Sequence, residues 1–172
     1  MDFERGHVKT TMHNVPVDDA PVSRGTIVHF LPDPDIFRET TVYDYKILMN
    51  RVRELAFLNK GLRISIADNR PDEPISESFH YEGGIKEYVD FLNTNKDVIF
   101  DEPIYVEGMD NGIEVEVSLQ YTDDYHSNML SFTNNIHTYE GGTHETGFKS
   151  ALTRVINDYA RKNNLLKESD DA

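Results

Sequence analysis

LSFTNNI (residues 130–136), HTYEGGTHE (137–145) and TGFKSALTR (146–154) form one continuous run in the last third of the chain. Apolar residues at alternate positions in the first part predict a strand over 130–136. A glycine pair then permits a tight turn, and Thr143 follows where a hydroxyl can cap a helix. Apolar residues next recur at helical spacing, which predicts a helix over about 143–164.

The rest of the chain is predicted to alternate between strands and two further helices. An apolar stripe at helical spacing begins at Tyr45 and ends before Gly61, a residue suited to a helix C-terminus. Residues 112–122 alternate strictly between apolar and polar, as in an antiparallel sheet covered on one side. Asp123-Asp124 is predicted to turn that strand into a pairing with 126–136. The remaining expected elements are strands at 3–13, 24–31, 62–67, 78–81 and 104–106 and a helix at about 83–94.

A polar segment at 68–77 is the best candidate for a domain boundary. It contains two prolines and separates two regions rich in predicted structure. We therefore expect one domain over residues 1–70 and a second over 71–172, and an α+β fold class.

Composition narrows the classes of function. Acidic residues outnumber basic ones by 31 to 17, for a net charge of −14. Binding to nucleic acid depends largely on basic residues that neutralise phosphates, so this charge argues against an autonomous DNA- or RNA-binding module. The chain has no cysteine, which excludes disulfides and thiolate chemistry. Neither an apolar run of roughly 20 residues nor an export signal is evident, so we expect a cytoplasmic protein without a membrane partner.

Five sequence strings resemble one known family, in the same order. The last is FTNNI, a short loop and GGTHETGFKSALTR. The others are FERG (3–6), GTIVHF with PDPDIF (25–30 and 32–37), RVRELAFLNKG (51–61) and FHYEGGIK (79–86). Together they resemble the B subunits of the bacterial type II topoisomerases, DNA gyrase and topoisomerase IV. Only Asp2 separates Met1 from a string that lies deep inside a domain in this family, so we expect a piece of a longer subunit.

The resemblance implies a more specific fold. Residues 1–70 would be the C-terminal part of a GHKL-type ATP-binding domain, the type shared with heat-shock protein 90, histidine kinases and MutL. Residues 71–172 would begin the transducer domain, an incomplete sheet like the second domain of ribosomal protein S5, with helices on one face.

Two residues are candidates for cofactor binding through this resemblance. The threonine of the family's Gly-Thr strand lies in the floor of the nucleotide pocket, and Thr26 matches it. Its hydroxyl can both donate and accept a hydrogen bond, which suits a network that holds the adenine edge. Val28, on the same face of the strand, would line the adenine pocket. Considered without the family, both residues are ordinary β-branched members of a strand.

The same resemblance implies that the residues that perform chemistry lie outside this segment. The family's Mg²⁺-binding Asn, water-activating Glu and phosphate lid would precede Met1, and the lysine that reaches the γ-phosphate would follow Ala172. We therefore expect no catalytic and no metal-binding residue here, and an isolated chain that is inactive. Seven histidines without ligand spacing agree with the expected lack of a metal site. The intact enzyme would use ATP and Mg²⁺, form a homodimer through its ATPase region, and act on DNA with the A subunit of gyrase or of topoisomerase IV.

Three alternatives remain open beside gyrase, which the strings favour. The B subunit of topoisomerase IV, an enzyme that decatenates DNA, is nearly as close. A MutL-type repair ATPase shares the same pair of domains. A stand-alone S5-like module that touches RNA belongs to a different class of function, and the net charge weighs against it.

Overall fold

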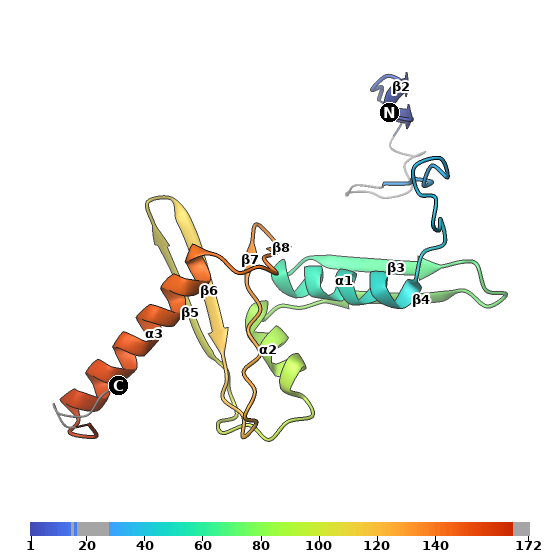
Figure 1. Ribbon diagram of the computed structural model, residues 1–172. Helices are drawn as coiled ribbons and strands as arrows, with labels where there is room; N and C mark the ends of the chain where they lie inside the picture. The colour runs from blue at the N-terminus through green and yellow to red at the C-terminus, as the bar shows by residue number, and fades with distance from the viewer. Residues whose placement is uncertain (15, 17–27, 167–172) are drawn as a thin grey trace. The chain divides into compact units, whose positions relative to one another are not determined.

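The computed structural model describes residues 1–14, 16 and 28–166. The chain divides into two compact units between Asp44 and Tyr45, and each is described by itself (Figure 1). Helices and strands are mixed along the described residues, so the expected α+β class is confirmed.

The first unit begins with a short hairpin. β1 (Asp2–Glu4) pairs antiparallel with β2 (His7–Thr10). Arg5 and Gly6 turn the chain between them with φ values of 49° and 81°. The single strand predicted over 3–13 is therefore wrong, because two successive residues with positive φ reverse the chain. Of the strand predicted at 24–31, residues 24–27 lie outside the described residues and 28–31 form no strand.

The second unit holds the remaining elements, and each of its strands pairs with its neighbour in sequence. In chain order they are α1 (Tyr45–Leu58), β3 (Arg63–Asp68), β4 (Ile75–His80), α2 (Ile85–Asn93), β5 (Ile104–Asp110), β6 (Ile113–Leu119), β7 (Phe132–Thr133), β8 (Ile136–His137) and α3 (Thr143–Lys162). The antiparallel pairs are β3–β4, β5–β6 and β7–β8.

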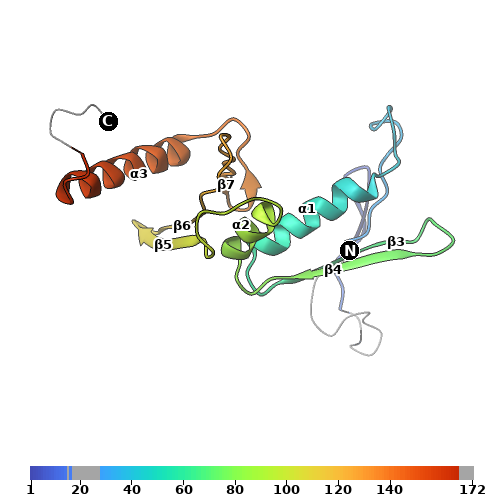
Figure 2. The same ribbon diagram turned by 90° about the horizontal axis from the view of Figure 1, so that it is seen from below.

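The core of the second unit lies where α1 packs against the β3–β4 hairpin and α2. Figure 2 shows α1 lying along the hairpin, with α2 beside it. Ala56 and Phe57 of α1 are buried, as is Phe79 of β4. The apolar stripe predicted for this helix does face the core, because residues at helical spacing share one side.

The polar segment predicted as a domain boundary is the loop of the β3–β4 hairpin. The two strands pair over their full lengths, from Arg63↔His80 to Asp68↔Ile75 next to the loop. The spatial division of the chain falls earlier, at Asp44. The domain limits of 1–70 and 71–172 therefore stay a prediction.

The strand over 112–122 is present as β6, but its partner differs from the one predicted. β6 pairs with β5, from Ile104↔Leu119 to Asp110↔Ile113. Asn111 and Gly112, with φ of 50° and 79°, make the connecting turn. The predicted pairing of this strand with 126–136 is wrong, because the nearer β5 already forms its ladder.

The seven-residue strand predicted over 130–136 is also wrong. Asn134 and Asn135 adopt φ of 49° and 64° and fold the segment into the two-residue hairpin β7–β8. Asparagine tolerates the left-handed conformation better than most residues, so an Asn-Asn pair can form this turn.

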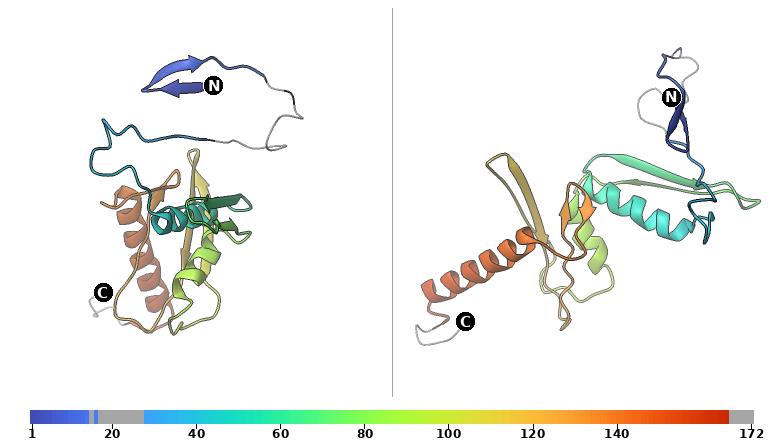
Figure 3. Two further views of the ribbon diagram at one scale, coloured as in Figure 1. Left: turned by 90° about the vertical axis from the view of Figure 1, so that its right-hand side faces the viewer. Right: turned by 45° about the horizontal axis from the view of Figure 1, so that its top comes forward.

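The long helix predicted in the last third is present as α3, which Figure 3 shows joined to the β7–β8 hairpin by a short loop. The capping role predicted for Thr143 is wrong: Gly142 occupies the N-cap, without a side-chain capping hydrogen bond. None of the side chains of α3 is buried. Its apolar stripe, which includes Val155, Ile156 and Tyr159, is exposed.

Candidate functional site

The structure does not bring the two predicted nucleotide-binding residues together. Thr26 lies outside the described residues, and Val28 is the first described residue after them. Val28 has 78% of its surface exposed. Its side chain therefore lines no pocket in the described part of the first unit, and the role of both residues stays a prediction.

The segment that follows Val28 is organised by the turn at PDPD. The Asp33 carboxylate accepts a hydrogen bond from the Asp35 N–H at 2.9 Å. The Asp33 carbonyl oxygen accepts from the N–H groups of Ile36 and Phe37 at 3.0 and 2.8 Å. Proline supplies no N–H, so these neighbouring donors and the aspartate side chain close the turn.

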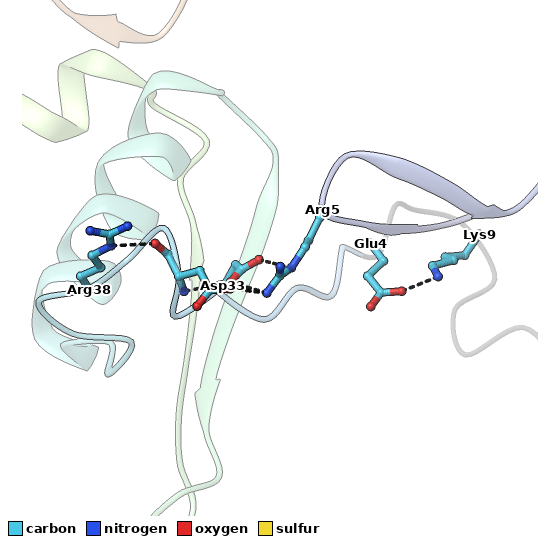
Figure 4. A network of polar contacts seen from close by, with 6 residues as sticks. Glu4, Arg5, Lys9, Asp33 and Arg38 are labelled. Carbon is cyan, nitrogen blue, oxygen red and sulfur yellow. Dashed lines mark hydrogen bonds and ion pairs between the residues drawn. The ribbon is translucent and has the colours of Figure 1, made fainter.

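Arg5 connects the β1–β2 turn to the PDPD turn (Figure 4). Its Nε lies 2.7 Å from Asp33 Oδ2, and its Nη2 lies 2.6 Å from Asp35 Oδ2. Arg38 Nε donates to the Asp35 carbonyl oxygen at 3.0 Å. The Arg5 side chain is 62% exposed, so solvent screens these pairs and each contributes little stability. Their effect is geometric, because they hold two segments 28 to 30 residues apart in contact.

Sequence reasoning named both of these strings but missed their contact. FERG contributes the guanidinium and PDPD the two carboxylates. The available signal was the opposite charge of the two strings, which is too common on protein surfaces to select one pair.

The described residues of the first unit do not form a site that fits ATP with Mg²⁺. The bend over 36–40 encloses an open hollow of about 480 Å³ that only these five successive residues line. Its walls come from one segment, whereas nucleotide pockets are built by several elements with converging polar groups. Within residues 1–14, 16 and 28–166, moreover, no three His, Asp or Glu side chains are grouped to hold a metal ion. This part of the chain therefore offers no geometry for a step that involves either group.

The best-ordered constellation lies in the second unit and is aromatic. The Phe57 ring stacks on Tyr81, with centroids 3.6 Å apart, and on Tyr88, at 4.8 Å. The Arg53 guanidinium lies over the rings of Phe79 and Phe91, at 4.9 and 5.3 Å from their centroids. A guanidinium over an aromatic face is attracted by the ring quadrupole. This cluster therefore ties α1, β4 and α2 into one body.

Burial in this cluster changes the ionisation of one tyrosine. Loss of solvation raises the pKa of Tyr88 to about 12, and the neighbouring Glu54 carboxylate acts in the same direction. Tyr88 is thus a neutral hydroxyl donor at physiological pH, and it lies 3.5 Å from Glu54 Oε1. The cluster has a structural chemistry: it packs rings and orients charges.

Comparisons with known proteins agree on one family. Residues 84–172 match the family DNA gyrase B. Over 170 residues the chain is 62% identical to the DNA gyrase B subunit of Enterococcus faecalis, covering 99% of this chain and 26% of that protein. The chain thus spans about a quarter of the length of the curated relatives that it matches.

Solved structures give the same result. The ATPase domain of gyrase B from Thermus thermophilus, in complex with an aminocoumarin, superposes with a TM-score of 0.68 at 35% identity, covering 82% of this chain and 38% of that one. The B subunit of DNA gyrase from Myxococcus xanthus superposes with a TM-score of 0.70 at 29% identity, covering 81% and 41%. This chain belongs to the DNA gyrase B family.

Proposed function

We propose that this chain is part of the B subunit of a DNA gyrase, an ATP-hydrolysing type II topoisomerase that introduces negative supercoils into DNA. The observation that carries the proposal is 62% identity over 99% of the chain to a DNA gyrase B subunit. The relatives that match nearly the whole chain are named as gyrase proteins, which favours supercoiling over decatenation.

Within that subunit we assign residues 1–70 to the end of the ATP-binding domain and 71–172 to the start of the transducer. The family match begins at Gly84, close to the proposed boundary. The stacking of Phe57 on Tyr81 and Tyr88 supports a tight junction between these two parts. A packed junction can pass a rigid-body movement from one domain to the next.

The nucleotide and the partners belong to the intact subunit. We propose that Thr26 and Val28 contribute to the floor of its adenine pocket, and that other parts of the subunit hold the ATP phosphates and Mg²⁺. By the same reasoning the subunit would dimerise through its ATPase region and act with the A subunit of gyrase on DNA in the cytoplasm. No helix among the described residues is long and apolar enough to cross a membrane. We expect the isolated chain to hydrolyse no ATP.

The proposal is tested with the full-length subunit, reconstituted with its own A subunit on relaxed plasmid DNA. Negative supercoiling that requires ATP is the expected result. Interlinked DNA circles are the second substrate. Decatenation without supercoiling would assign the subunit to topoisomerase IV instead, and inactivity on both substrates would remove the topoisomerase function altogether.

A further inference from the structure

The β7–β8 hairpin is hydrogen-bonded at both ends, to α1 at its tip and to the start of α3 at its base. Figure 3 shows it between these two helices. Its strands contribute only two residues each, so the ladder alone holds few bonds. The side chains at its two ends are therefore what attach it to the rest of the second unit.

At the tip, Asn135 makes two contacts with α1 and the residue that follows it. Arg51 Nη2 donates to the Asn135 carbonyl oxygen at 2.9 Å. The Asn135 side-chain Nδ2 donates to Asn59 Oδ1, also at 2.9 Å. Asn59 is itself fixed, because its Nδ2 donates to the Leu55 carbonyl oxygen at 2.7 Å. The turn thus meets one donor and one acceptor that α1 already orients.

Arg51 is oriented by a further partner. Its Nη1 forms an ion pair with Glu54, one turn further along the helix. Glu54 also lies within reach of the Tyr88 hydroxyl of α2, at 3.5 Å. The Glu54 side chain is only 18% exposed, which strengthens its hydrogen bonds relative to those of a solvated pair. The hairpin tip therefore docks on a network that joins α1 to α2.

At the base, hydroxyl groups connect the two strand ends to α3. Ser131 Oγ and Thr138 Oγ1 lie 2.6 Å apart. Ser131 Oγ donates to Glu145 Oε2 at 3.2 Å, and Thr138 Oγ1 lies 3.2 Å from His144 Nε2. The hydrogen bond from Lys149 lowers the pKa of Glu145, so this acceptor stays ionised near neutral pH.

α3 has little else to hold it among the described residues. None of its side chains is buried, and its side-chain hydrogen bonds with the hairpin base come from His144 and Glu145 in its first turn. A helix held at one end takes its direction from that end.

We propose that the β7–β8 hairpin is a strut that sets the position of α3 relative to α1, with Arg51, Asn59 and Asn135 as its positioning residues. This inference rests on the proposed function in one respect: in the intact subunit, the strut would carry a nucleotide-driven movement of α1 into α3. Coupling of this kind requires a demonstrated effect of one element on the other, rather than a line of contacts.

The turn itself supplies a matched pair of variants. Asn134 and Asn135 both have positive φ, but it is the Asn135 side chain that donates to Asn59. Glycine accepts positive φ at either position. Asn135→Gly therefore removes the amide contact with Asn59, and Asn134→Gly makes the same backbone change without removing that contact.

The first experiment measures the distance between the two helices in this chain. The sequence has no cysteine, so Lys46→Cys in α1 and Arg154→Cys in α3, both at exposed positions, give two unique sites for spin labels. Double electron–electron resonance should show one narrow distance distribution in the parent and in Asn134→Gly. In Asn135→Gly the undocked population should rise roughly 2- to 10-fold, the range expected for one lost hydrogen bond.

Identical distributions for the two glycine variants, whether both narrow or both broad, would overturn the strut. Asn59→Ala provides the second variant, because it removes the acceptor beside α1 without touching the turn. It should broaden the distribution as Asn135→Gly does, and an unchanged distribution in a folded Asn59→Ala chain would equally contradict the proposal.

The second experiment uses the full-length subunit with its A subunit. Asn135→Gly should lower the number of supercoils introduced per ATP hydrolysed by roughly 2- to 10-fold relative to Asn134→Gly. An equal yield in the two variants would overturn the coupling role. A parent enzyme that does not supercoil DNA would instead overturn the proposed function, while the distance measurement would still decide whether the strut exists.

Discussion

Phe57 of α1 stacks on Tyr81 with ring centroids 3.6 Å apart and planes inclined by 12°. Phe57 is 2% exposed and is the largest fully buried side chain among the described residues. It also contacts the rings of Tyr88 and Phe91 on α2. One side chain of α1 thus contributes to packing with both neighbouring parts of the second unit.

Phe57→Ala should strongly destabilise the second unit. Removing a buried phenylalanine ring loses its transfer free energy and leaves a cavity, at a typical cost of about 3–5 kcal/mol. The free energy of unfolding from urea titration measures this loss. Ile99→Ala is the control, because Ile99 is 68% exposed and should cost far less. Equal losses in the two variants would show that the aromatic cluster is not the core.

Asp68 should titrate at unusually low pH. Hydrogen bonds from the Arg70 guanidinium lower the pKa of Asp68 from 3.8 to about 2. A pKa that is lower in the folded state stabilises it above the ordinary value, and that contribution is lost as pH falls from 3.8 towards 2. Carboxyl ¹³C chemical shifts should give a midpoint of about 2 in the parent.

Arg70→Ala tests the cause of this shift in the pKa of Asp68. The midpoint should return towards the ordinary 3.8, because the guanidinium supplies the leading contribution. Arg63→Ala, at an exposed position on the same hairpin, should leave the midpoint in place. A midpoint for Asp68 that stays low without Arg70 would assign the shift to another group.

In the full-length subunit, Thr26→Ala should weaken nucleotide binding without unfolding the protein. The loss of one neutral hydrogen bond costs about 0.5–1.5 kcal/mol, which lowers affinity by roughly 2- to 10-fold. Calorimetric titration with a non-hydrolysable ATP analogue and Mg²⁺ measures the affinity, and the melting temperature controls for folding. If both values match the parent, Thr26 is only a strand residue.

The isolated chain should self-associate. Val155, Ile156 and Tyr159 of α3 are 60%, 48% and 64% exposed. Ile113 and Val115 of β6 are likewise exposed on one face of a two-stranded sheet with free edges. Exposed apolar stripes and unpaired strand edges both favour association.

Light scattering over a dilution series measures this tendency. Ile156→Glu should lower the average mass, because it places a charge within the apolar stripe. Asp158→Glu, at an exposed polar position of the same helix, is the matched control and should change nothing. A monomer at every concentration in the parent would contradict the expectation.

Local pattern was sufficient for the helices and for most strands. α1, α2 and α3 lie where apolar spacing predicts them, and β3 and β6 differ from prediction by a few residues at their ends. Local pattern failed at Arg5-Gly6 and at Asn134-Asn135, where the sequence suggested continuous strands. Alternation does not distinguish a strand from a two-residue hairpin, because residues on either side of such a turn can keep the same alternation.

The amino-acid sequence by itself determined the α+β class, the three helices and, through its strings, the family. Tertiary structure decided which of those strings meet. Arg51 and Asn135 are 84 residues apart, and Arg5 and Asp33 are 28 apart. The physical reason is that helix and strand patterns arise from interactions between near neighbours, whereas contacts across such separations depend on how whole elements pack.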